Sequence, residues 1–61
     1  MKLSKYLSEK KIEQQDFAKS IRVKPPSVSR YVKGERIPRR EIARRIAKAT
    51  LGMVTISDFY A

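Results

Sequence analysis

The sequence predicts an all-α domain of five short helices. Apolar residues recur at helical spacing along the chain, beginning with Leu3, Tyr6 and Leu7. Within residues 14–34, two short helical segments are separated by a tight turn, and a glycine follows the second segment, as is common at helix ends. A chain of 61 residues without a cysteine can bury only one small core, so we expect a single domain over residues 1–61.

The first helix is predicted over residues 2–10, where it covers the core with its apolar side. Its polar side contains Lys2 and Lys5, and nothing in the sequence distinguishes a phosphate contact by either from an ordinary solvated lysine. The core-covering role is therefore the expected one.

The second helix is expected to begin after Glu13, which we assign as its N-cap. Asp16 then falls at the third helical position, where its carboxylate can accept a hydrogen bond from the N–H of the cap residue. Ile12 and Phe17 have the spacing of a hydrophobic staple, so we expect them to pack together.

The third helix is predicted from Pro26 to about Val32, with Pro25 extended as its N-cap. Proline suits a first helical turn because no hydrogen-bond partner exists there for an N–H, and a residue that precedes proline is disfavoured in the helical region. The turn before this helix, residues 21–24, contains Arg22.

The fourth helix is predicted over residues 39–50. Its buried stripe is expected to comprise Ile42, Ile46 and Ala49, with Ala43 alongside. An ion pair between Glu41 and Arg45 fits their spacing of four residues. The basic side chains of this helix are expected in solvent, namely Arg40, Arg44, Arg45 and Lys48. In the loop before this helix, Ile37 is expected to enter the core.

The last segment is open to two interpretations. Gly52 is expected to end the fourth helix, and Thr55 with Asp58 has the spacing of a capping box for a short fifth helix. The alternative is a strand over residues 53–59, and the capping pattern favours the helix. Leu51 and Phe59 are expected to close the core, while other apolar residues near them stay exposed.

The charge distribution indicates a polyanionic partner. Fifteen Lys and Arg residues against six Asp and Glu give a net charge of +9. Residues 22–48 contain ten basic and two acidic residues, a net of +8, whereas residues 49–61 contain no Lys or Arg. Phosphate neutralisation with counterion release dominates the binding of proteins with such basic clusters to nucleic acid.

Composition argues against several other classes of function. The chain lacks cysteine and histidine, its carboxylates are scattered, and no nucleophile lies beside a base, so we expect no metal, no cofactor, no small-molecule ligand and no enzymatic activity. It also lacks a membrane-spanning run and a secretory segment, so we expect the cytoplasm of a bacterial host.

Residues 14–34 resemble the helix-turn-helix of the phage Cro and repressor family. Seven residues match its pattern in register, and the similarity continues through Pro38 and residues 42–49; the seven are Gln14, Phe17, Ala18, Val23, Val28, Ser29 and Gly34. Arg22 departs from the pattern, because the family has a glycine at this position of the turn. Either the turn differs from that of the family, or Arg22 accepts a strained left-handed backbone. The resemblance implies a five-helix, repressor-like fold in which the third helix, the recognition helix, lies in the DNA major groove.

The resemblance also implies which residues contact DNA. Gln14 would touch the DNA backbone, and Pro25 and Pro26 occupy positions where relatives read bases, so their rings are expected against thymine methyl groups. Arg30 matches another reading position and is expected to bind guanine. The complete set of expected DNA contacts is Gln14, Gln15, Lys24, Pro25, Pro26, Ser27, Ser29, Arg30, Lys33, Arg36 and Arg39.

The function that follows is a sequence-specific regulator, of the phage Cro type, that binds a pseudo-palindromic double-stranded operator. We expect a homodimer on DNA that pairs through residues 49–61, because this is the one stretch without repulsive basic charge. The alternative is a small helix-turn-helix antitoxin or accessory module whose main partner is another protein. Base-specific binding distinguishes the two.

Overall fold

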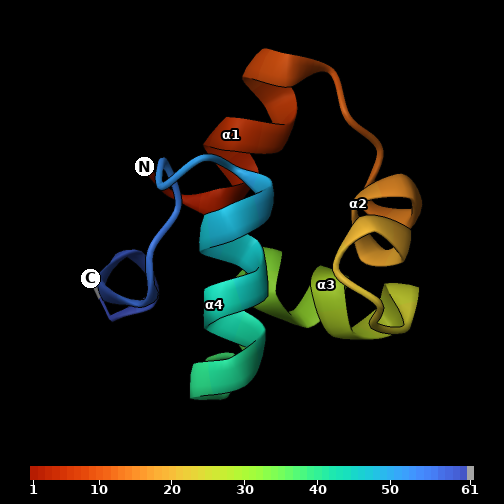
Figure 1. The fold of residues 1–61 in the computed structure, drawn as a ribbon. Helices are drawn as coiled ribbons and strands as arrows, with labels where there is room; N and C mark the ends of the chain where they lie inside the picture. Colours follow the sequence, from red (N-terminus) through yellow and green to blue (C-terminus); the bar gives the residue numbers. More distant parts are fainter. Residues whose placement is uncertain (61) are drawn as a thin grey trace.

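The computed structural model describes residues 1–60 and shows an all-helical arrangement, without a strand in those residues (Figure 1). Its elements are α1 (Leu3–Lys10), α2 (Gln14–Ser20), α3 (Pro25–Lys33), α4 (Arg40–Ala49) and a 3₁₀ turn, η1 (Ile56–Phe59). The predicted all-α fold class is confirmed, and the fifth helix is a single 3₁₀ turn rather than a strand. Ala61 lies outside the described residues.

The core lies where α2 crosses α3, with α1 and α4 packed against this pair. Ala18 of α2 and Val28 of α3 are both fully buried, as a close crossing requires. Aromatic rings extend the core at two edges: the ring centroids of Tyr6 and Phe17 are 6.5 Å apart. Those of Tyr31 and Phe59 are 6.3 Å apart, in an edge-to-face arrangement that joins α3 to η1.

The start of α2 is only partly as expected. Glu13 has the extended backbone of an N-cap, with φ −75° and ψ 148°, and the partly buried Ile12 packs against the core that contains Phe17. The predicted bond from the cap N–H to Asp16 is wrong, because no side chain caps this helix and Asp16 is exposed. Water can solvate the first N–H groups of an exposed helix end, so the cap bond is not obligatory.

Helix α3 begins one residue earlier than predicted. Lys24 is the N-cap, with ψ 143°, and Pro25 and Pro26 occupy the first two helical positions. Neither of these positions needs an N–H, so both prolines are accepted, and the residue forced into the extended region is Lys24. The helix ends with Lys33, and Gly34 closes it in the left-handed region at φ 77°.

Arg22 has the left-handed backbone conformation for which the family uses a glycine at this position. Its φ is 59°, in the left-handed region, and the turn is closed by a 3.0 Å bond from the Val23 N–H to the Ala18 carbonyl. The turn is therefore the ordinary one of the pattern, built with an arginine. A left-handed arginine costs about 1 kcal/mol relative to a relaxed backbone.

Arg22→Gly should consequently raise the free energy of unfolding, by roughly 0.5 kcal/mol. The relief of strain exceeds the added entropy that glycine gives to the unfolded chain. Arg22→Ala is the matched control, since it removes the same charge but keeps a Cβ, and it should remain roughly 0.5 kcal/mol below the glycine variant. Urea denaturation of the three proteins measures the difference, and a glycine variant no more stable than the alanine variant would contradict it.

The buried face of α4 is rotated from the predicted one. Ala43, Ile46 and Thr50 are buried, Ile42 is half-buried, and Ala49 is exposed, so its assignment to the core is wrong. Thr50 can be buried because its hydroxyl donates to the Ile46 carbonyl at 2.8 Å and accepts from the Val54 N–H at 3.1 Å.

The loop before α4 also differs from its prediction. Ile37 is 44% exposed, so its assignment to the core is wrong, and Pro38 is buried instead. Neighbouring side chains of a non-helical segment point in different directions, so one of the two stays outside.

Arg45 joins α4 to the turn of the helix-turn-helix. Its guanidinium donates to Glu41 at 2.9 Å, which confirms the predicted ion pair, and also to the Ile21 carbonyl at 3.4 Å. The expectation that this side chain lies only in solvent is therefore wrong. The second bond satisfies a carbonyl at the C-terminal end of α2 and links two segments 24 residues apart.

After α4 the chain reverses through Leu51 and Gly52, whose φ angles are 55° and 80°. Leu51 is 91% exposed, so its predicted place in the core is wrong: Val54, which is fully buried, fills the core at this end. The capping interaction at η1 is confirmed, since the Thr55 N–H donates to the Asp58 carboxylate at 2.8 Å.

Candidate nucleic-acid interface

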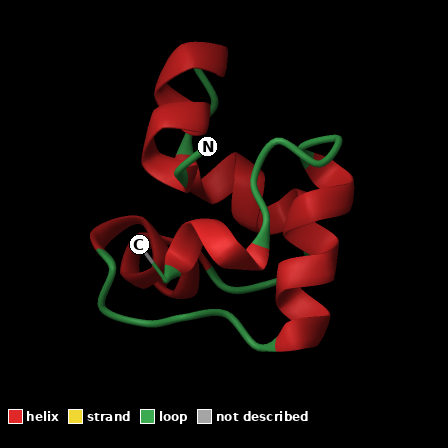
Figure 2. Ribbon diagram, turned by 90° about the vertical axis from the view of Figure 1, so that its left-hand side faces the viewer, coloured by secondary structure: helices red, strands yellow, loops and turns green. Residues whose placement is uncertain are grey.

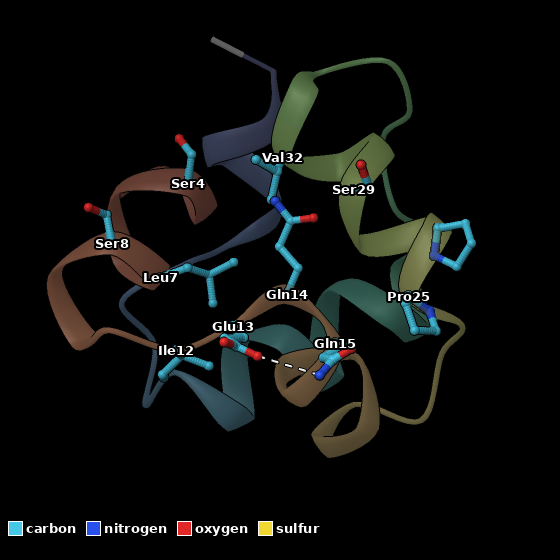
Figure 3. A pocket seen from close by; sticks show the side chains of 11 residues that line it. Ser4, Leu7, Ser8, Ile12, Glu13, Gln14, Gln15, Pro25, Ser29 and Val32 are labelled. Carbon is cyan, nitrogen blue, oxygen red and sulfur yellow. Dashed lines mark hydrogen bonds between the residues drawn. The ribbon is translucent and has the colours of Figure 1, made fainter.

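An open groove lies between α1, the start of α2 and α3 (Figure 3). We call it the front groove. Apolar and polar side chains from three helices line it together. It is lined by Ser4, Leu7, Ser8, Ile12, Glu13, Gln14, Gln15, Pro25, Pro26, Ser29 and Val32.

The two glutamines at the start of α2 differ in their hydrogen bonding. The Gln14 side chain extends into the front groove (Figure 3), and its amide has no hydrogen bond to another of the described residues. The Gln15 amide donates to the Glu13 carboxylate at 3.4 Å. Gln14 is thus free to donate to an incoming acceptor, whereas Gln15 must first release, or share, its bond to Glu13.

The start of α3 presents apolar rings to solvent. Pro25 and Pro26 are both exposed and line the front groove, together with the half-buried Ser29. Ser27 is half-buried but does not line the groove, so the structure separates the two serines that the sequence treated alike. Because the two exposed proline rings carry no polar side-chain atom, this end of the helix is suited to apolar contacts.

The expected cationic contacts surround α3 rather than lining the front groove. Lys24 and Arg30 are exposed and lie outside it, while Lys33 and Arg36 line a smaller hollow at the C-terminal end of α3. Arg39 and Arg36 line a third hollow, between the following loop and α4. Five of the eleven expected DNA contacts therefore line the front groove. The five expected basic residues lie outside it.

Two serines that line the groove were not among the expected contacts. Ser4 and Ser8 of α1 place hydroxyl groups on its rim (Figure 3). They are four residues apart, so they face the same way from one helix. Their spacing was visible in the sequence, but the packing of α1 beside the recognition helix was not.

The geometry defines a helix-turn-helix of the DNA-binding class: a seven-residue helix, a four-residue turn, and a nine-residue helix whose outer side is exposed and cationic. A family model described as helix-turn-helix, of the Cro/C1 type, matches residues 3–51. The chain belongs to this family, whose members are DNA-binding and not enzymes, and the match supports a DNA-binding transcriptional regulator.

Two other comparisons are negative: no curated protein and no solved structure matches the chain. Within residues 1–60, no helix has the length and apolar character needed to cross a bilayer. The same residues contain no group of three or more side chains placed to hold a metal ion.

Proposed function

We propose that the chain is a sequence-specific repressor of the phage Cro type, which inserts α3 into the major groove of an operator in the bacterial cytoplasm. The observation behind the proposal is that the exposed start of α3 and the free amide of Gln14 share one groove. The start of α3 can contact base edges while the Gln14 amide contacts the backbone of the same duplex.

Base reading falls to one side of α3. Pro25 and Pro26 offer only apolar surface, which suits the methyl group of thymine. Arg30 follows Pro26 by four residues, about one helical turn, so it faces the same way. Its guanidinium can donate to O6 and N7 of a guanine together.

Backbone contacts fall to the residues around this reading side. Gln14 and Gln15 lie at the start of α2, and Ser29 lines the same groove. The cations beyond the groove suit phosphates because they need no particular base. The remaining proposed backbone contacts are the cations Lys24, Lys33, Arg36 and Arg39, together with the hydroxyl of Ser27.

Arg30→Ala should weaken binding to the best operator by about 1–3 kcal/mol and relax the preference at one base pair. Arg44→Ala is the matched control, because it removes an equally exposed arginine from α4 and should change affinity much less. Fluorescence anisotropy on the operator and on its single-base variants measures both effects. Equal losses on the operator and on random duplex would make Arg30 a backbone contact only.

A homodimer formed on DNA through residues 49–60 completes the proposal. A nine-residue helix reads only a few base pairs, and pairing two copies doubles the sequence that is read. Leu51, Met53 and Tyr60 are 91%, 41% and 66% exposed, and no basic residue lies in this stretch to repel a second copy. The expected interface also included Ala61, which lies outside the described residues.

Selection of bound sites from a random duplex library tests both whether the protein binds DNA base-specifically and whether it binds as a symmetric dimer. We expect an inverted repeat whose half-sites lie about one helical turn, ~34 Å, apart. Enrichment of a single half-site would contradict the dimer. No enrichment at all would contradict base-specific binding and favour the alternative, an antitoxin or accessory module that binds another protein.

A further inference from the structure

A cationic hollow lies where the start of α1 meets the C-terminal end of α3. Three basic side chains line it from three separate segments: Lys2 just before α1, Lys33 at the end of α3, and Arg36 in the loop that follows. Figure 2 turns toward the viewer the side of the molecule on which the N-terminus and η1 lie. The convergence depends on the packing of α1 against α3, which the sequence did not reveal.

We propose that Lys2, Lys33 and Arg36 together hold one phosphate of the bound DNA backbone, and that α1 is therefore part of the DNA-binding surface. This inference rests on the proposed DNA-binding function. It assigns a role to Lys2, which the sequence could not distinguish from a solvated lysine.

The three cations have no counterion among the described residues. All three are exposed, and neither ion pair within residues 1–60 includes any of them. Like charges that share a small concave surface repel one another, and an anion placed between them removes that repulsion. A phosphate diester brings the required charge and several acceptor oxygens for lysine and arginine donors.

The one carboxylate at the hollow is already engaged. Asp58 accepts a hydrogen bond from the Thr55 N–H at 2.8 Å and pairs with the N-terminal amine at 3.1 Å. These two contacts, the Thr55 bond first, lower the pKa of Asp58 below its ordinary value. Its negative charge is balanced by the amine, so it does not neutralise Lys2, Lys33 or Arg36.

The position of the hollow suits DNA rather than an unrelated anion. It adjoins the front groove, with which it shares Ser4 and Val32. It lies at the end of α3 opposite to the prolines, roughly 12 Å away along a nine-residue helix. The phosphate held here therefore differs from the one that Gln14 would contact, and the two fix the recognition helix at both ends.

Lys2→Gln and Lys5→Gln form a matched pair of test variants. Both remove one exposed lysine near the start of the chain, but Lys5 lines neither the front groove nor the cationic hollow. The Lys2 side chain makes no cap bond to α1, so its loss should leave the helix intact, as circular dichroism would verify. The affinity of each protein for a fluorescent random-sequence duplex is measured at several salt concentrations.

The expected result is that Lys2→Gln reduces the slope of log K against log salt measurably, by up to about 1, which is the change for the complete loss of one phosphate contact. Lys5→Gln should change the slope much less. The losses in log K from Lys2→Gln and Arg36→Gln should also be non-additive in the double variant, because the two side chains share one phosphate.

Two results would overturn the inference without affecting the proposed function. One is a wild type that binds DNA while the Lys2 and Lys5 variants have the same slope. The other is strictly additive losses in log K from Lys2→Gln and Arg36→Gln, which would mean that the two side chains do not share a phosphate. A wild type that does not bind DNA would contradict the proposed function itself.

Discussion

Replacing Ile46 with alanine should remove about half of the domain's free energy of unfolding. Ile46 is fully buried in the middle of α4 and belongs to the core formed by all the helices. Truncating such a side chain costs about 2–5 kcal/mol, through lost burial and the cavity that remains. At roughly 0.05–0.15 kcal/mol per residue, a chain of 61 residues has a total stability of only about 3–9 kcal/mol.

Leu51→Ala is the control for this substitution. It removes a large aliphatic side chain from the C-terminal side of α4, but this side chain is 91% exposed. Its effect on the free energy of unfolding should stay within about 0.5 kcal/mol. Urea denaturation followed by circular dichroism compares the two variants, and similar denaturation midpoints would mean that Ile46 is not part of the folding core.

The helices were predictable because their signals are local. Apolar spacing located all four α-helices to within about two residues, and the Thr55–Asp58 spacing identified the final turn. The same holds for the pairing of α2 with α3, since both faces of this seam lie within one short stretch. The start of α3 was predicted at Pro26, one residue too late. Either of the two adjacent prolines can be the first residue of a helix, so the sequence did not decide between them.

The errors concern burial, which depends on distant neighbours. Ile37 and Leu51 are apolar but exposed, and Thr50 is polar but buried. Periodicity shows that a helix has an apolar face. Which residues at the edges of that face are buried depends on the segments that pack against the helix. Thr50 is accepted in the core only because Ile46 and Val54 satisfy its hydroxyl, a geometry that no spacing rule specifies.

In the candidate site, too, the sequence predicted the residues within the helix-turn-helix but not those that a distant segment brings to it. The residues of α2 and α3 that line the front groove were predicted from the helix-turn-helix pattern. Ser4, Ser8 and Lys2 were not, because α1 comes beside the recognition helix only after folding. The conformation of Arg22 was also open until its φ was known, since the residue type opposed what the pattern required.

Raising the salt concentration from about 50 to about 200 mM should weaken binding to a single DNA half-site roughly 10²- to 10³-fold. The net charge of +8 over residues 22–48 suits about four to six phosphate contacts per half-site, each contributing about −0.9 to the slope of log K against log salt. Unfolding midpoints measured at both salt concentrations must show that the protein stays folded throughout. With folding held constant, an affinity that hardly changed would mean that phosphates contribute little to binding, and the basic residues around α3 would then need another partner.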